Sequence, residues 1–459
     1  MFIKNYYDLL DTAENTEDRQ ARKIILDCIN VALESVDPKV IIKQNVRIRD
    51  QTLMIRNLKF DLRKIKNIYV IGGGKACGAM AEALEEILGD RISYGLVNVL
   101  KGTEKQFKTT KIKLIGASHP IPDKVGMQGA QQMLNIAQEA KKDDLVIVLI
   151  SGGGSALMPL PVPPITLEEK RKTTMLLLKS GATINEINAV RKHISLIKGG
   201  QLAKACYPAT VISLIMSDVV GDPINTIASG PTAPDNTTFK DAYRVLQRYN
   251  LLDKIPKNVC KYIEKGLEGI VPETPKSGDR IFSTVHNLVI ANNRLACQAA
   301  LNEAKNLGIN AMILSTHIEG EARHVGTVLA GIAREIYRYN HPLRKPALII
   351  AGGETTVTVT GSGKGGRNQE VALSAALKID KLQGIAIASI GTDGIDGVTD
   401  AAGGLVDSTT IKRGKEKGLE ALVYLSNNDS YTYLKSVGDI IFTGPTGSNV
   451  NDIMLIAVI

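Results

Sequence analysis

Two glycine-rich stretches in the last third of the chain carry the residues best suited to chemistry. Each follows an apolar, β-branched run, Ala347–Ile350 or Ile385–Ile390, so each stands where a strand ends and the chain turns. In open α/β sheets, ligands bind outside the carboxyl ends of the strands. The polar residues of the two stretches are Glu354, Lys364, Arg367, Asn368, Asp393, Asp396 and Asp400. Cations beside freed backbone amides, with carboxylates opposite, suit a polyanion and its metal ion, so the pattern predicts a phosphate-handling enzyme.

The second stretch, GTDGIDGVTD, also supplies the candidate metal ligands. Mg²⁺ usually binds through few protein carboxylates and bridges substrate phosphates. We therefore expect Asp393 and Asp396 to hold it, with Glu354 behind them. The alternative is that these carboxylates only accept hydrogen bonds from backbone amides of their own turn.

Lys75 stands at the start of a predicted helix, after the predicted strand Asn67–Ile71 and a run of glycines that includes Gly73 and Gly74. The spacing is not a dinucleotide-binding fingerprint, because Cys77 occupies the place of the third glycine, and there is no P-loop. A lysine beside the free amides of a helix N-terminus suits an anion or a phosphoryl group. The alternative is a tight turn with a solvated lysine.

A second glycine junction follows the predicted buried strand Leu145–Ile150. It consists of Ser151, Gly152, Gly153, Gly154 and Ser155. Glycines let the backbone approach a ligand closely, which favours a cradle for phosphate or carboxylate over a plain turn. A serine nucleophile is disfavoured, because the string is not GxSxG and no histidine is paired with it by motif.

Four basic residues crowd the segment INAVRKHISLIKGG, at Arg191, Lys192, His193 and Lys198. One interpretation is a charged helix face. The other is an anion clamp at the helix break, formed by Lys198, Gly199 and the amides that follow.

Two aspartates follow the predicted strand Val211–Met216. Asp218 lies immediately past the strand end, where a carboxylate is well placed to act as a general base or to bind a metal. Asp222 precedes Pro223 and either shares this role or caps the turn.

The net charge of +9 is concentrated in Lys39–Lys66, where nine Lys and Arg face two Asp. Alternating polar and apolar residues there predict a hairpin with a solvated basic face, and a positive field also favours anionic substrates. Trp is absent and aromatic residues make up 4% of the chain, so we expect no nucleic-acid partner.

The five cysteines are scattered and never in CxxC spacing, which fits a reducing compartment. The N-terminus lacks the apolar region of a signal peptide, and the longest apolar runs are strand-length. We therefore expect a soluble, cytoplasmic protein without membrane contact, either a monomer or a homodimer.

Strand and helix patterns alternate along the chain, which predicts an α/β fold of two domains. Residues 1–283 are expected to form a Rossmann-like domain with a parallel sheet, and residues 284–459 a smaller domain. A strand at Thr355–Thr360, after a tight turn, would run antiparallel to its neighbour and make the second sheet mixed. The polar segment VPETPKSGDR is the best linker candidate.

Taken together, the motifs resemble those of the class II glycerate 2-kinases, whose C-terminal half is called the MOFRL domain. The resemblance covers nearly the whole chain and rests on an ordered set of strings: GGGKA, SHPIPD, SGGGSAL, INAVRKHIS with IKGG, SDVVGDP with IASGPT, GGETTVTV with GKGGRNQE, GTDGIDG with TDAAGG, and GPTGSNVND. Each string alone is weak, whereas the ordered set is specific.

The resemblance implies transfer of a phosphoryl group from ATP, with Mg²⁺, to the 2-hydroxyl of D-glycerate, in a cleft between the two domains. It places the catalytic lysine at Lys75, the catalytic arginine at Arg367 and the candidate base at Asp218. Domain closure would then bring the two cations together. The alternatives are a hydroxypyruvate reductase, a kinase that yields 3-phosphoglycerate and a non-enzymatic nucleotide sensor.

Overall fold

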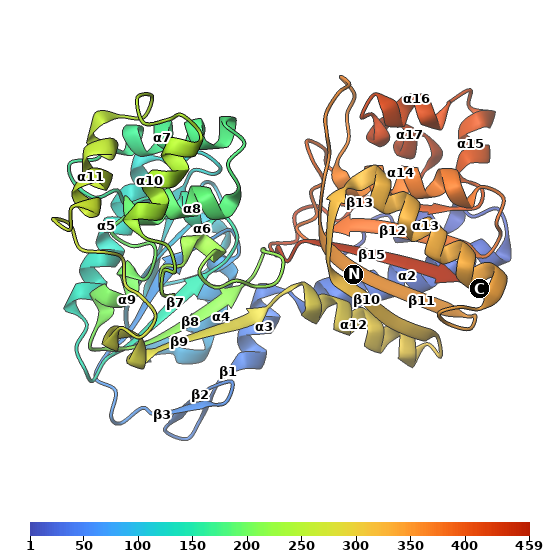
Figure 1. Ribbon diagram of the computed structural model, residues 1–459. Coiled ribbons are helices and arrows are strands. Elements are labelled where there is room, and N and C mark those ends of the chain that lie inside the picture. Colours follow the sequence, from blue (N-terminus) through green and yellow to red (C-terminus); the bar gives the residue numbers. More distant parts are fainter. The chain divides into compact units, whose positions relative to one another are not determined.

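The structure is a computed structural model that describes residues 1–459. The chain packs as two compact units (Figure 1). We call Ile41–Ile290 the middle unit, and Met1–Val40 together with Ala291–Ile459 the terminal unit. None of the helices combines the length and the apolar composition that a transmembrane span requires.

The middle unit is built on a six-stranded sheet in the order β6-β5-β4-β7-β8-β9. The strands are β4 (Ile68–Gly73), β5 (Ile92–Leu100), β6 (Ile112–Ala117), β7 (Leu145–Ile150), β8 (Thr210–Met216) and β9 (Val285–Ala291). The pairs β5–β6, β4–β5, β4–β7 and β7–β8 are parallel. All six residues of β7 are buried, as expected for a central parallel strand covered on both faces. The predicted parallel sheet is confirmed.

Helices of the middle unit follow the strands along the chain. They are α4 (Cys77–Leu88), α5 (Lys124–Glu139), α6 (Gly154–Leu157), α7 (Leu167–Lys179), α8 (Ile184–His193), α9 (Gln201–Cys206), α10 (Phe239–Arg248) and α11 (Lys257–Leu267). Helices α7 and α8 are separate because Thr183 caps α8 in a capping box with Glu186. Together with α10 and α11 they enclose an apolar cluster of their own.

The basic segment forms the end of α3 (Pro38–Asn45) and a small antiparallel sheet of β1 (Val46–Arg49), β2 (Thr52–Ile55) and β3 (Leu58–Asp61). Leu53 and Ile55 are buried, whereas Arg47, Arg56 and Lys59 are exposed. The expected solvated basic face is therefore present, on three strands rather than two.

The terminal unit contains a mixed sheet in the order β10-β11-β15-β12-β13-β14. Its strands are β10 (Asn310–Glu321), β11 (Ala347–Thr356), β12 (Ile385–Gly391), β13 (Gly403–Asp407), β14 (Ile440–Ile441) and β15 (Asp452–Val458). The mixed sheet is confirmed, but the expected reason for it was wrong. Residues 347–356 form one continuous strand, parallel to β10, and β15 supplies the antiparallel pairing to both β11 and β12.

Helices cover both faces of this sheet, with α2 and α12 on one face and α13 and α14 on the other (Figure 1). The helices are α1 (Tyr6–Asp11), α2 (Thr16–Ser35), α12 (Asn293–Asn306), α13 (Ala322–Tyr339), α14 (Arg367–Ile379), α15 (Thr410–Glu416), α16 (Ala421–Ser426) and α17 (Ser430–Val437). Their apolar faces and the sheet form one continuous core.

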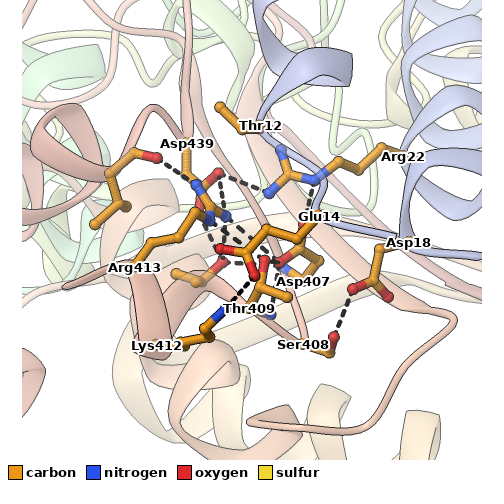
Figure 2. Close-up of polar contacts among 12 residues, drawn as sticks. Thr12, Glu14, Asp18, Arg22, Asp407, Ser408, Thr409, Lys412, Arg413 and Asp439 are labelled. Atoms are coloured by element: carbon orange, nitrogen blue, oxygen red, sulfur yellow. Dashed lines mark hydrogen bonds and ion pairs between the residues drawn. The ribbon is translucent and has the colours of Figure 1, made fainter. Parts of the chain in front are cut away.

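Helix α2 joins the terminal unit through a buried charge network (Figure 2). Arg22 of α2 is fully buried and donates from Nε to Asp407 Oδ2 at 2.5 Å and from Nη2 to Asp439 Oδ1 at 2.6 Å. Arg413 also donates to Asp439, from Nη2 to Oδ2 at 2.9 Å. Asp18 accepts from the backbone N of Gly384 at 2.7 Å. The buried Arg22 and the partly buried Arg413 thus balance the charges of two buried aspartates, since a buried charge is costly unless it is paired.

The division of the chain therefore differs from the predicted 1–283 and 284–459. Residues 1–40 belong with the C-terminal half, and β9 belongs to the sheet of the middle unit, so the chain changes unit at Ile290. The segment VPETPKSGDR is not a free linker. Glu273 accepts from the backbone N of Phe239 at 2.8 Å, and Thr274 donates to the buried Asp235 at 3.0 Å.

Candidate active site

In the middle unit, three candidate segments meet at one edge of the sheet. Strands β4, β7 and β8 are neighbours and parallel, with Gly73 opposite Ile150 and Ile150 opposite Ile215. Lys75, the Ser151–Ser155 junction and Asp218 follow these strand ends within a few residues. The parallel pairing thus brings together segments that are far apart in the sequence, as we predicted from the strand ends.

The side chains of Lys75, His119 and Asp218 surround the backbone of Gly152 and Gly153. A Cβ atom on Gly152 would lie 2.3 Å from Asp218 Oδ2, and one on Gly153 would lie 3.3 Å from Lys75 Cγ and 3.1 Å from His119 Cδ2. Side chains at these two positions would displace the three polar groups. The glycines therefore allow these three side chains to lie close to the backbone. Gly153 also adopts a left-handed φ of 81°.

The charges of this group are coupled. Burial raises the pKa of the Asp218 carboxyl above its ordinary value, while the nearby positive charge of Lys75 acts in the opposite direction. Burial, and secondly the charge of Lys75, lower the pKa of His119, so that its ring is neutral at pH 7. No carboxylate forms a salt bridge with Lys75. A half-buried, unpaired lysine thus faces a carboxylate of increased basicity.

The glycine junction leaves two backbone donors free. The amides of Gly152 and Gly153 have no hydrogen-bond acceptor in the protein, whereas the Gly152 carbonyl accepts from the backbone N of Lys75 at 2.9 Å. Free amides next to a lysine are groups that could bind an anion, which is the role predicted for this junction.

Ser151, Gly73 and Gly74 hold the cradle in place. The Ser151 hydroxyl is buried and accepts from the backbone N of Ala76 at 3.0 Å. A Cβ atom on Gly74 would lie 2.1 Å from that hydroxyl, and one on Gly73 would lie 2.9 Å from Met158 Cγ. These residues fix the spacing of β4 and β7, and they present no free polar group to a ligand.

Ser155 extends the site away from Lys75. Its hydroxyl lies 2.8 Å from the Ser229 hydroxyl, which in turn donates to Asn188 Oδ1 at 3.0 Å. Ala228 and Ser229 both have left-handed φ angles, 51° and 62°. Such strained residues persist only where surrounding contacts fix them, commonly at functional sites.

The basic residues at the end of α8 and in the turn that follows it differ in their partners. Lys192 Nζ lies 3.2 Å from Asp235 Oδ1, and His193 Nε2 lies 3.0 Å from Glu273 Oε2. Lys198 has no carboxylate partner and is 1% exposed. The amide of Gly199 donates to the Ser229 carbonyl at 3.0 Å and is therefore not available to an anion. Of the expected clamp, the lysine is buried without a carboxylate partner, and the amide that follows it is already bonded.

Asp222 is less well placed than Asp218. It lines a shallow pocket of about 420 Å³ with Ile224, Asn225, Ala233, Pro234, Asn236 and Asn287. Neither Lys75 nor Gly152 lines that pocket. The two aspartates that follow β8 therefore lie in different surroundings.

In the terminal unit, Arg367 is the first residue of α14 and is held by two carboxylates. Its Nε donates to Asp452 Oδ2 at 2.6 Å and its Nη2 to Asp452 Oδ1 at 3.0 Å. Its Nη1 lies 3.0 Å from Glu354 Oε1. Burial opposes the charged form, but these carboxylates raise the pKa of Arg367 further above its ordinary value. The Arg367 side chain remains 33% exposed, so a ligand can reach it.

Asp396 caps the start of the same helix. Its Oδ1 accepts from the backbone N of Asn368 at 3.1 Å, and its Oδ2 accepts from the backbone N of Gln369 at 2.9 Å. Asn368 is buried, and its Nδ2 donates to Asp452 Oδ1 at 3.0 Å. A Cβ atom on Gly366 would lie 2.3 Å from Asp396 Cγ, so only glycine fits there.

The other polar residues of these two stretches lie nearer the surface. Asp393 is half-buried and accepts from the backbone N of Ile395 through Oδ1 at 3.1 Å. Asp400 accepts from the Tyr431 hydroxyl at 2.6 Å, and Lys364 Nζ stands 4.2 Å from the centre of the Tyr431 ring.

Two family models match the sequence. A domain of unknown function, DUF4147, matches residues 24–264, and the MOFRL family matches residues 347–452. A glycerate 2-kinase of Pyrococcus horikoshii is 46% identical over 95% of this chain and 96% of its own length. The chain belongs to the class II glycerate 2-kinase family.

Two further members of this family are similar over the same extent. The crystal structure of a glycerate kinase from Thermotoga maritima has a TM-score of 0.85 and 39% identity, and the match covers 95% of this chain and 99% of that one. A protein of Agrobacterium vitis, 39% identical over 96% of this chain and 95% of its own length, is provisionally named a hydroxypyruvate reductase. The names given to family members thus include both a kinase and a reductase.

Two residues of the candidate site in this chain were not predicted from the sequence. Asp452, which binds Arg367, ends the string GPTGSNVND, and a carboxylate at the start of a buried strand was the available signal. The other is His119, to which the sequence assigned no role although it lies in the string SHPIPD among the matching motifs.

For Mg²⁺, the structure contains no group of three or more His, Cys, Asp or Glu side chains arranged to hold a metal ion. Among the residues predicted as ligands, Asp396 uses both oxygens to cap α14 and Glu354 pairs with Arg367. Asp393 is half-buried and uses Oδ1 in its own turn. The donor set therefore fits an ion held by few protein ligands and mainly by substrate phosphates.

Proposed function

We propose that this protein is a glycerate 2-kinase that transfers the γ-phosphoryl group of ATP to the 2-hydroxyl of D-glycerate, yielding 2-phospho-D-glycerate and ADP. One observation carries the proposal within the structure: Lys75 and Asp218 act on one another across the free amides of Gly152 and Gly153. The similarity to glycerate kinases over nearly the whole chain supports the same conclusion.

Phosphoryl transfer depends mainly on positioning and on neutralising the charge of the transferred group. Lys75 and the two free amides supply a fixed cation and oriented dipoles, which cost no reorganisation when the reaction occurs. We assign Lys75 to the transferred phosphoryl group. Gly152 and Gly153 bind its oxygens through their amides, while Gly73, Gly74, Ser151 and Gly154 hold the cradle in shape.

Asp218 is the proposed general base. A base works best when its pKa lies near the working pH, and burial moves the pKa of Asp218 upward in that direction. The charge of Lys75 opposes this shift and favours the ionised carboxylate, which is the form that accepts the proton of the glycerate 2-hydroxyl. Asp222 is the alternative base.

Arg367 is the second proposed catalytic cation. It is the residue to which the family resemblance assigns that role, and its partly exposed guanidinium keeps a positive charge that suits phosphate oxygens. Asp452 and Asn368 are positioning residues, because they reach the reaction only through Arg367 and its helix.

Mg²⁺ is the proposed metal cofactor. When bound, it neutralises the phosphate oxygens of ATP. Asp393 is the residue best suited to hold it, with Glu354 as a second ligand. Asp396 fits this role less well than we expected, because its oxygens already accept amides of α14.

The reaction product tests the proposal. Purified protein, incubated with ATP, Mg²⁺ and D-glycerate, should yield ADP and a phosphorus NMR signal of 2-phosphoglycerate. A 3-phosphoglycerate signal would refute the regiochemistry. Steady oxidation of NADH with hydroxypyruvate would instead favour the reductase activity for which one relative is named. The absence of ADP production with any hydroxy acid would favour a nucleotide sensor.

A further inference from the structure

Three basic residues of the middle unit lie near one another, and none of them is paired with a carboxylate. They are Lys170 of α7, Arg191 of α8 and Lys198 in the turn before α9. Lys170 is 4% exposed and Lys198 is 1% exposed, while Arg191 is half-buried. None of the three forms a salt bridge. We call them the cation cluster.

The few contacts of the cation cluster leave most of its donors unused. Lys198 Nζ donates to the Ala228 carbonyl at 3.3 Å, and Lys170 Nζ donates to the Arg191 carbonyl at 3.5 Å. Each ammonium has three donors, so one long bond to a neutral acceptor satisfies it poorly. An isolated buried charge is costly unless it is paired.

The neighbouring residues show that this is a property of the cation cluster and not of the whole helix. Lys192 and His193 follow Arg191 directly, yet they are paired with the carboxylates of Asp235 and Glu273. Two basic residues of this segment therefore have carboxylate partners, whereas the three residues of the cation cluster have none.

The electrostatic consequence is visible in all three groups. Burial, and secondly the charge of Arg191, lower the pKa of Lys170 to about 7. Burial and the charges of Lys170 and Arg191 lower the pKa of Lys198 well below its ordinary range. Burial also lowers the pKa of Arg191. Burial is the main cause in all three groups, and repulsion among the basic groups adds to it for the two lysines. A bound anion would oppose these shifts and favour the charged forms.

The cation cluster is joined to the glycine cradle by direct contacts. The Ala228 carbonyl binds Lys198, and a Cβ atom on Gly154 would lie 2.9 Å from Ala228 Cβ. The next residue, Ser229, connects Ser155 of the cradle to Asn188, which lies one turn before Arg191 on α8. Ala228 and Ser229 thus contact the cradle on one side, and Lys198 or helix α8 on the other.

We propose that Lys170, Arg191 and Lys198 form a binding site for a phosphate group that is not the group being transferred, a site that rests on the proposed kinase function. Three cations without an acid match the charge of a phosphate or polyphosphate, whereas the single charge of the glycerate carboxylate would leave the cluster strongly positive. The half-buried guanidinium of Arg191 makes the first contact with the anion, since its fork suits phosphate oxygens. The phosphate belongs either to the nucleotide or to the phosphorylated acid.

Direct binding measurements test the site without relying on turnover. Calorimetric titrations would use pyrophosphate, ADP, 2-phosphoglycerate and D-glycerate with the wild type and with Arg191→Gln and Lys198→Met. Pyrophosphate affinity should fall roughly tenfold or more in each variant, because a charge-assisted contact is lost. A parallel loss for ADP alone identifies the nucleotide as the ligand, and a parallel loss for 2-phosphoglycerate alone identifies the product.

Two controls separate binding from folding. Lys204→Met removes an exposed lysine of α9 and the same net charge, so its affinities should equal those of the wild type. Lys198→Met should have a melting temperature equal to or above that of the wild type, because it replaces a buried polar group that makes one long hydrogen bond with an apolar side chain. Arg191→Lys, which keeps the charge, should recover part of the affinity.

The possible failures are distinguishable. Unchanged pyrophosphate affinity in Arg191→Gln and Lys198→Met would overturn the phosphate site and leave the kinase proposal intact. A loss of affinity for D-glycerate alone would also overturn it, because the cluster would then bind the carboxylate. Phosphate binding that depends on the cluster, in a protein without kinase activity, would instead refute the proposed function.

Discussion

Arg367 and Asp452 lie 85 residues apart in the sequence and form a two-pronged ion pair, with distances of 2.6 and 3.0 Å. Asp452 is fully buried at the start of β15, and Arg367 begins α14. Burial raises the pKa of Asp452, and the hydrogen bonds and charge of Arg367 oppose this effect. The pair fixes the guanidinium plane at two of its three nitrogens, so Asp452 determines where Arg367 points.

The first prediction follows from this pairing. Asp452→Asn keeps the shape of the side chain but removes the charge, so Arg367 should lose its fixed orientation. We expect kcat to fall about 10- to 100-fold, the usual cost of losing a partner that orients a functional group. Arg367→Ala should lower kcat roughly 10²-fold or more. Steady-state kinetics would measure both, and Asp452→Asn with the kcat of the wild type would refute the positioning role.

Lys75→Ala should abolish most of the activity without unfolding the protein. The lysine has no salt bridge to lose, and its proposed contact is with the transferred phosphoryl group. We expect kcat to decrease roughly 10²-fold or more, the typical cost of one preorganised charge. Lys113→Ala on β6 removes an exposed lysine and serves as the matched control. Normal turnover by Lys75→Ala, with a circular dichroism spectrum like that of the wild type, would exclude Lys75 from the mechanism.

Asp218→Asn should lower kcat roughly 10²-fold or more, because an amide cannot accept the proton of the glycerate hydroxyl. The acidic limb of the wild-type pH profile should report an apparent pKa above the ordinary value for Asp, as burial raises the pKa of this carboxyl. That limb should be lost in the residual activity of the variant. Normal turnover by Asp218→Asn together with inactive Asp222→Asn would move the base to Asp222.

The metal assignment can be tested at Asp393. Asp393→Asn should raise the Mg²⁺ concentration needed for half-maximal activity about tenfold, because a carboxylate ligand becomes a neutral amide. Asp400→Asn alters an exposed acid of the same turn, whose oxygen accepts from Tyr431, and should leave the requirement unchanged. If both variants have the Mg²⁺ requirement of the wild type, Asp393 does not hold the metal ion.

The last prediction concerns stability and pH. Arg22→Met leaves Asp407 and Asp439 buried with one cation fewer, which should cost about 3–5 kcal/mol in the free energy of unfolding at pH 7. Burial alone would raise the pKa of Asp407, but the charges of Arg22 and Arg413 hold it at about 2, below the unfolded value of 3.8.

The sign of the pH effect follows from that shift. A folded pKa below the unfolded one contributes stability that is present above pH 4 and is lost as the pH falls toward 2. Urea unfolding at pH 7, 4 and 3 should therefore show the difference between wild type and Arg22→Met shrinking as the pH falls. A difference that stays constant over this range would contradict the assigned role of the Arg22–Asp407 pair.

Local sequence patterns were sufficient to predict several of the strands and the glycine junctions, but not the third strand of the basic segment or the course of residues 355–360. The run Leu145–Ile150 is a strand with the predicted bounds, since six consecutive apolar residues before three glycines allow little else. The ends of β4, β7 and β8 meet as expected, because parallel neighbours bring their carboxyl ends to one edge. The ordered motifs also indicated the family, which the comparisons confirm.

Only the tertiary structure decided which charges are paired. Arg22 and Asp407 are 385 residues apart, and their contact assigns the N-terminal helices to the terminal unit. Among neighbouring basic residues, Lys192 has a carboxylate partner and Lys198 has none, although both stand in one short string. The physical reason is that apolar periodicity is a property of adjacent residues, whereas the partner of a buried charge depends on which distant elements pack against it.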